Sequence, residues 1–225
     1  MNAPIETGIA YRCRFEKCGP IRFISHLDLT RAFHRAFSRA EIPLKFSEGF
    51  SPHPKFSFAL PLSVGTESTV ELADFTLKAG FTATEEEIRD RLQAQMPAGI
   101  RILGIFPQGA KFSEIAFADY RVLLPGMRPE AIFAANRALE GELVVKKKNK
   151  KGKWVEKEIS QGIRSIRFEE TPEGVVMYAT LSAAGEAYLK PETVLDVLAE
   201  RLPEESFAQR RILRFGIYLS DMTPF

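Results

Sequence analysis

The sequence predicts an α+β fold made of two tandem ferredoxin-like lobes, with a lysine-rich hairpin inserted in the second lobe. Three observations support this expectation. The 225 residues include 18 phenylalanines, and many of these alternate with polar residues as they do in β-strands. Two stretches with helical spacing of apolar residues interrupt the strands in each half of the chain. The resulting order in each half is β-α-β-β-α-β, which is the ferredoxin-like order.

Residues 1–108 are expected to form the first lobe. Ser25 is typical of a helix N-cap, and Asp28 follows three residues later, close to a capping box. The helix should extend from His26 to Ala40, with apolar residues along one face. The strands are expected at residues 11–17, 56–62, 69–78 and 100–106, and a second helix after Thr84.

Residues 109–225 are expected to form the second lobe, with the same order of elements. No obvious sequence repeat links the two halves, so the duplication depends on the pattern of elements alone. One larger α+β sheet is the alternative. The expected strands are 117–124, 163–169, 174–181 and 211–219, the helices are 129–140 and 191–202, and the arms of the inserted hairpin are 142–148 and 153–159.

Composition narrows the classes of function. The net charge is only +2, so nucleic-acid binding would depend on where the charge lies. Cys13 and Cys18 have a spacing typical of neither a zinc knuckle nor a redox pair. With no secretory signal and no apolar run near the ~18 residues of a membrane span, we expect a cytoplasmic protein. Phosphate loops and nucleotide-binding glycine fingerprints are missing from the sequence, so we expect no cofactor.

Basic residues are concentrated between Arg12 and Lys55, where nine basic and four acidic residues leave a local charge of +5. Arg31, Arg35 and Arg39 follow at intervals of four and share one helical face, away from the apolar residues. The planar guanidinium suits phosphate oxygens, so the spacing indicates an anion-binding face. A solvated face is the alternative.

The loop from Ser47 to Lys55 has a proline on each side of His53, which stiffens the backbone. Stiffness suits a positioned ligand contact or an acid–base group. Phe50 in this loop could stack on a base or anchor the loop in the core. His26 could lie near His53 and, with Asp28, even bind a metal. The chain offers no third strong ligand at a recognised spacing, so we expect no metal and favour structural or RNA-contacting histidines.

A second basic segment, residues 146–157, holds seven lysines and one glutamate on the two arms of the inserted hairpin. Trp154 lies among them, and basic residues around an aromatic are typical of nucleic-acid binding. Lysines on an exposed hairpin also prevent unwanted strand pairing. The pattern favours neither interpretation.

Two runs, Phe23–Leu29 (FISHLDL) and Lys45–Lys55 (KFSEGFSPHPK), together with Pro61–Gly65 and Glu71–Asp74, resemble the signature of the radical-SAM-linked protein family. The likeness covers nearly the whole chain and is clearest over residues 11–78. In this bacterial family of unknown function the domain stands alone, or is fused to or encoded beside a radical SAM protein. The resemblance implies an accessory role, because the chain lacks the C-x3-C-x2-C cluster motif of the radical enzyme itself.

We therefore expect a non-catalytic RNA-binding accessory protein that works with a radical SAM enzyme, in tRNA or rRNA modification or processing. One alternative is a metal-independent ribonuclease-like enzyme that uses His26 and His53. Another is a protein-docking module for the radical SAM partner. The expected RNA or anion contacts are Arg31, Arg35, Arg39, Lys45, Phe50, His53, Lys55, Lys147, Lys150 and Lys151.

Overall fold

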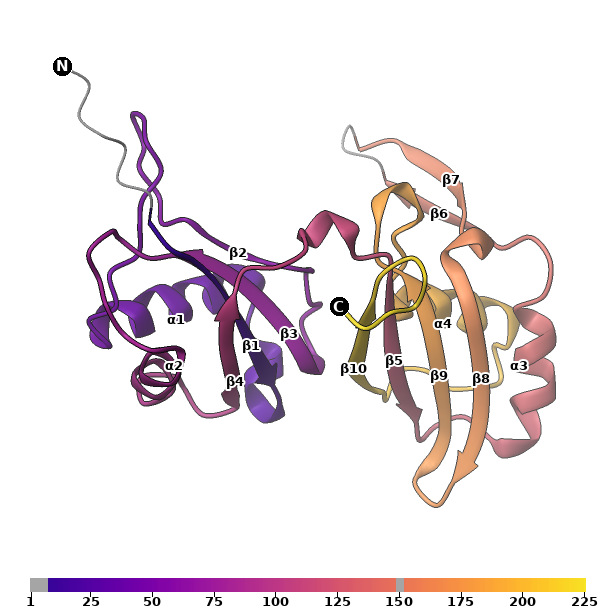
Figure 1. The fold of residues 1–225 in the computed structure, drawn as a ribbon. Helices are drawn as coiled ribbons and strands as arrows, with labels where there is room; N and C mark the ends of the chain where they lie inside the picture. Colours follow the sequence, from indigo (N-terminus) through magenta and orange to yellow (C-terminus); the bar gives the residue numbers. More distant parts are fainter. Residues whose placement is uncertain (1–7, 149–151) are drawn as a thin grey trace. The chain divides into compact units, whose positions relative to one another are not determined.

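The computed structural model describes residues 8–148 and 152–225. These residues form an α+β protein with four α-helices (Figure 1). The chain divides into two compact units, Met1–Phe112 and Ser113–Phe225. No helix in the described part of the chain is long and apolar enough to cross a membrane.

The first unit has a four-stranded antiparallel sheet in the order β4-β1-β3-β2. Strand β2 is shorter than predicted, because its ladder with β3 pairs only Phe56–Phe58 with residues 73–75. The elements of this unit are β1 (Ala10–Lys17), α1 (His26–Arg39), β2 (Phe56–Phe58), β3 (Thr66–Thr76), α2 (Glu85–Gln93) and β4 (Ile100–Pro107).

Helix α1 begins at the predicted cap. The Ser25 hydroxyl oxygen accepts the backbone N–H of Asp28 at 3.1 Å, which confirms the prediction from the sequence. The buried face of α1 carries Phe33 and Phe37, and Phe33 packs against Phe15 of β1 with ring centroids 4.8 Å apart. Apolar residues of α2 join the same core, so both helices cover one face of the sheet.

The second unit has an antiparallel sheet in the order β10-β5-β9-β8, and a separate two-stranded hairpin, β6-β7. Helix α3 begins three residues later than expected, because Pro129–Ala131 form a 3-10 turn before it. The elements are β5 (Phe117–Leu124), α3 (Ile132–Ala138), β6 (Val144–Lys148), β7 (Trp154–Glu158), β8 (Ile163–Thr171), β9 (Gly174–Ser182), α4 (Pro191–Arg201) and β10 (Arg211–Tyr218).

Candidate functional site

Residues 44–55 form a short hairpin, here called the His53 hairpin, which is anchored to the end of β3. The backbone N–H of Lys45 donates to the Thr76 carbonyl at 2.7 Å, and the N–H of Thr76 donates to the Lys55 carbonyl at 3.0 Å. Across the hairpin, Phe46 and Pro54 form an antiparallel bridge. Figure 1 shows this segment as a narrow loop that extends away from the strands of the first unit.

The His53 hairpin has a polar face and an apolar face, because successive residues of an extended strand point to opposite sides. Lys45, Ser47, His53 and Lys55 alternate with the apolar residues along its two arms. The apolar residues are Leu44, Phe46 and Pro54. The sequence did not reveal these faces, since they depend on which residues pair across the hairpin.

Ser47 fixes the orientation of the His53 ring. Its hydroxyl oxygen lies 3.0 Å from Nδ1 of His53 and accepts the backbone N–H of the same residue at 3.1 Å. Nδ1 also lies 3.4 Å from the carbonyl oxygen of Ser51, so two neighbours of the same loop hold this side of the ring. His53 is exposed, which leaves Nε2 accessible to a ligand.

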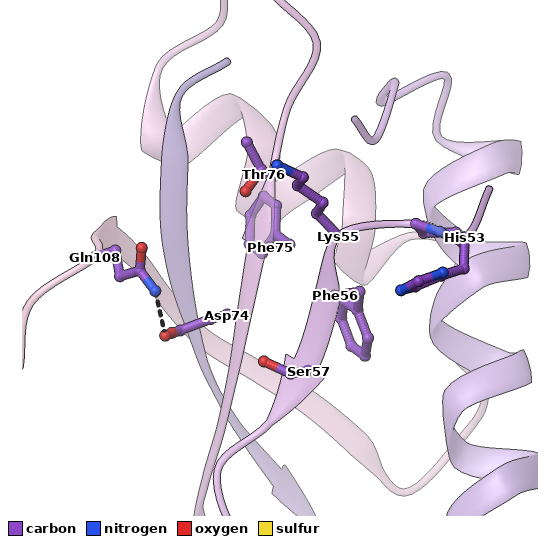
Figure 2. A pocket seen from close by; sticks show the side chains of 9 residues that line it. His53, Lys55, Phe56, Ser57, Asp74, Phe75, Thr76 and Gln108 are labelled. Atoms are coloured by element: carbon purple, nitrogen blue, oxygen red, sulfur yellow. Dashed lines mark hydrogen bonds between the residues drawn. The ribbon is translucent and has the colours of Figure 1, made fainter. Parts of the chain in front are cut away.

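A pocket of about 250 Å³ lies beside the polar face of the His53 hairpin. Figure 2 shows Asp74 and Gln108 on the side opposite His53, with the rings of Phe56 and Phe75 between them. The hydroxyl groups of Ser57 and Thr76 add further hydrogen-bond donors and acceptors to the lining. The lining residues are His53, Pro54, Lys55, Phe56, Ser57, Asp74, Phe75, Thr76 and Gln108.

The Asp74 carboxylate is held by two neighbours and is nearly buried. Arg12 donates to it from Nε at 2.8 Å and from Nη2 at 3.0 Å, and Gln108 donates from Nε2 at 2.7 Å. Because Arg12 neutralises Asp74, the remaining positive charge at the pocket comes from Lys55. Lys55 is exposed and has no ion pair within the described residues. The pocket therefore suits an anion or another acceptor-rich ligand.

Phe50 lies at the tip of the His53 hairpin and is wholly exposed. The alternative in which Phe50 anchors the loop in the core is therefore wrong. Lys45 is half-buried on the polar face, close in sequence to this tip. The exposed Phe50, His53 and Lys55 thus occupy one small hairpin.

The three arginines on α1 differ in their surroundings. Arg31 pairs with Asp28 at 3.1 Å, and Arg39 donates to the Gln95 carbonyl at 2.7 Å. Arg35 is exposed and has no ion pair among the residues that the structure describes. Arg35 is consequently the one of the three whose guanidinium is most available to an anion.

The structure does not bring His26 and His53 together by any hydrogen bond or common cavity within the described residues. His26 is exposed at the start of α1, and its ring centroid lies 5.3 Å from that of Phe58. His34, two turns further along the same helix, contacts Phe56 and lines a cavity with Pro54. Sequence reasoning missed His34, although its spacing of eight from His26 places both on one face of the helix.

The basic residues of the inserted hairpin are only partly described. Lys147 lies on β6 opposite Val155, whereas Lys150 and Lys151 lie outside the described residues. Trp154 is exposed on β7. Lys157 donates to the carbonyl oxygens of Glu186 and Tyr188, so this lysine is tied to the rest of the unit.

The two thiols are poorly suited to nucleophilic or metal chemistry. Burial raises the pKa of Cys13 far above its usual value. Burial, followed by the negative charges of Glu67 and Glu16, also raises the pKa of Cys18. Both thiols therefore stay protonated at neutral pH. In the described parts of the chain, no three or more His, Cys, Asp or Glu side chains gather as metal ligands would.

The fold and the site define an α+β protein with a cationic, aromatic-tipped hairpin beside a polar pocket. The chain belongs to a family of uncharacterized proteins conserved in bacteria (DUF2344), whose family model matches residues 10–191. No curated protein matches the chain. The family match includes the whole His53 hairpin and every strand and helix of the first unit.

Proposed function

We propose that this protein binds single-stranded RNA through the His53 hairpin and acts as a non-catalytic accessory to a radical SAM enzyme that modifies or processes tRNA or rRNA. The observation that carries the proposal is the wholly exposed Phe50 at the tip of a hairpin that also presents His53 and Lys55. An isolated exposed aromatic is common. One on the same small hairpin as hydrogen-bond donors and a lysine has the composition with which proteins stack an unpaired base and hold its phosphate.

The phosphate contacts would come from donors that the fold leaves available. Lys55 is exposed beside the pocket, and Nε2 of His53 is oriented by the contact between Nδ1 and Ser47. Arg35 on the exposed face of α1 adds a planar guanidinium, whose N–H groups can donate to phosphate oxygens. Because Arg12 compensates Asp74, the pocket carries no unpaired carboxylate that would repel a phosphate.

The radical SAM partner is inferred from the resemblance of the FISHLDL and GFSPHPK runs to the radical-SAM-linked family. We also infer that both units are ferredoxin-like. In support, β1-α1-β2-β3-α2-β4 with sheet order β4-β1-β3-β2 corresponds element by element to β5-α3-β8-β9-α4-β10 with order β10-β5-β9-β8, once the β6-β7 hairpin is set aside.

Binding of an unstructured, fluorescently labelled RNA, measured by anisotropy at 50 mM salt, tests the proposal. Phe50→Ala should weaken binding by about 1–3 kcal/mol, the usual worth of one stacked base. Phe133→Ala removes another exposed aromatic, from α3, and should leave the affinity unchanged. Lys55→Ala should also weaken binding, whereas Lys190→Ala, at another exposed lysine, should not. Absence of binding at 50 mM salt, or equal losses in the control variants, would overturn the proposal.

Two further measurements, RNA cleavage and co-purification, distinguish the alternatives. A ribonuclease would need a second acid–base group near His53, and the carboxylate in that pocket, Asp74, is engaged by Arg12 and Gln108. RNA cleavage that disappears in His53→Ala while binding persists would favour the enzyme. Co-purification with the radical SAM partner that survives nuclease treatment, without any RNA binding, would favour the docking module.

A further inference from the structure

A second cavity lies on the apolar face of the His53 hairpin. Its volume is about 260 Å³. Pro54 borders both this cavity and the polar pocket, so the two hollows lie on either side of one hairpin. The lining residues are His34, Phe37, Ser38, Ile42, Pro43, Leu44, Phe46, Pro54 and Lys78.

The walls of this cavity are mainly apolar. Its polar side chains are an imidazole, a hydroxyl and an ammonium group, from His34, Ser38 and Lys78. Phe46 is 47% exposed, so one aromatic ring borders the cavity without being buried in the core. Ser38 and Lys78 are exposed, so their polar groups are accessible to a ligand in this cavity. An apolar cavity with a few polar groups is typical of a small-ligand site.

An unpaired nitrogen of His34 also indicates that this cavity binds a ligand. Its Nε2 atom is buried and has no hydrogen bond to any described residue. Buried polar groups are nearly always paired in native proteins, so an unpaired one calls for an explanation such as a missing ligand. Burial also lowers the pKa of His34, which keeps the ring neutral at neutral pH. A neutral imidazole carries one donor and one acceptor and suits an uncharged polar edge better than a phosphate.

We infer that this cavity receives one unstacked nucleobase of the bound RNA, which stacks on Phe46, meets His34 and Ser38 at its polar edge and leaves Lys78 for the adjoining phosphate. This inference rests on the proposed RNA binding and deepens it, because it adds a site that can tell one base from another. The cavity is slightly smaller than the ~300–1,000 Å³ of pockets for drug-sized ligands. Its size therefore suits a single ring system rather than a longer segment of the strand.

The placement of the two hollows supports a base over an apolar peptide or lipid group. An aliphatic group would leave the cation of Lys78 and the ring nitrogen of His34 unused. A nucleotide uses both, since a base is flat and polar at its edge and a phosphate is anionic. The strand would pass over the hairpin, with a phosphate near Lys55 on one side and the base on the other.

The test compares the affinities of the full chain for homohexamers of A, C, G and U. Wild type should separate the tightest from the weakest by about tenfold or more, as hydrogen-bonding sites do. Ser38→Phe, at an exposed position that borders the cavity, should fill it and reduce the spread to about threefold or less. Phe46→Ala should also reduce the spread, and it should weaken binding of all four homohexamers because every base loses its stacking surface. Ser165→Phe, at an exposed serine of β8, is the matched control and should keep the wild-type spread.

Equal affinity of wild type for all four RNAs, or a preference that persists in Ser38→Phe and Phe46→Ala, would overturn the base site and leave RNA binding intact. Failure to bind any RNA would instead overturn the proposed function, and the base site with it. A second readout follows the imidazole protons of His34 by NMR during titration with the four nucleoside monophosphates. A saturable shift with at least one of them, absent in Ser38→Phe, supports the inference, and no shift with any of them contradicts it.

Discussion

Asp74 and Arg12 show how a charge is retained beside a pocket without repelling a ligand. The two residues are direct partners in the register of β1 and β3, so the backbone itself brings their side chains together. Both side chains are nearly buried, and Gln108 occupies a second acceptor position on the carboxylate. Loss of one partner from a buried pair typically costs about 3–5 kcal/mol, because the remaining charge is uncompensated. Removal of either partner should therefore destabilise the wall of the pocket.

His34 should make the free energy of unfolding depend on pH. Its folded-state pKa is lowered below 6.5 by burial, so the unfolded chain binds a proton more readily than the folded protein does. The resulting contribution to stability is fully present above the unfolded pKa and is lost as the pH falls through the lower, folded pKa. We expect His34→Phe, which keeps a ring against Phe56, to become more stable relative to wild type when the pH falls from about 7.5 to 5.5.

Urea denaturation of both proteins at the two pH values measures this change. Ser38→Ala, on the same helix but without a titratable group, serves as the control and should show no pH-dependent difference from wild type. A constant difference in unfolding free energy between wild type and His34→Phe at both pH values would contradict the prediction.

At the scale of elements, the β6-β7 hairpin is expected to be dispensable for folding. Its base is formed by the buried residues Leu143 and Ile159, which are joined by a 2.8 Å backbone hydrogen bond. Val145 and Lys157 face each other just beyond this base. Deletion of residues 146–156, with Val145 joined to Lys157 by an Asn-Gly turn, should therefore preserve the fold.

Thermal unfolding and RNA binding check this prediction separately. The midpoint of unfolding should change by no more than about 4 °C, equivalent to roughly 1 kcal/mol in a chain of this size. RNA affinity should fall if the deleted lysines extend the binding track. Leu143→Ala, which leaves the hairpin but opens its buried base, should destabilise the protein by about 2–5 kcal/mol. An unfolded deletion variant would show that the hairpin is structural.

The elements that the sequence predicted well are those governed by local rules. Ser25 caps α1 and Thr84 caps α2 with a full capping box, because each cap depends on residues three positions apart. The short β2 and the late start of α3 were missed, since strand length depends on the partner strand and Pro129 permits a 3-10 turn as readily as an α-helix.

The candidate site was predictable in content but not in arrangement. Proline spacing identified His53, and composition identified Lys55 and Phe50, yet the two faces of the hairpin follow from the bridge between Phe46 and Pro54. His34 gave only a weak signal, because one histidine beside buried phenylalanines is usually structural. Its unpaired nitrogen is a tertiary property that no local pattern reveals.

For the whole molecule, charge distribution matters more than total charge. The net charge is +2, whereas residues 12–55 carry +5, so the rest of the chain is slightly acidic. We expect RNA affinity to arise from a few local contacts and not from a general attraction. With three to five phosphate contacts, the logarithm of the association constant should fall against the logarithm of salt concentration with a slope of about −2 to −3.5.

An anisotropy titration at several salt concentrations gives this slope. Lys55→Ala should make the slope less steep by about 0.7, the value of one single-strand phosphate contact. Lys190→Ala should leave it unchanged. A slope near zero would argue against phosphate contacts, and one far steeper than −3.5 would indicate a binding surface larger than the first unit's basic segment.

The two shielded thiols have a practical consequence. Because Cys13 is buried and the pKa of the half-buried Cys18 is raised, we expect both to react slowly with maleimide reagents near neutral pH. A single cysteine placed at an exposed position, such as Ser51→Cys in the His53 hairpin, would therefore take up a fluorophore or spin label selectively. The wild-type cysteines could stay in place, and the label would report spectroscopically on the His53 hairpin in solution.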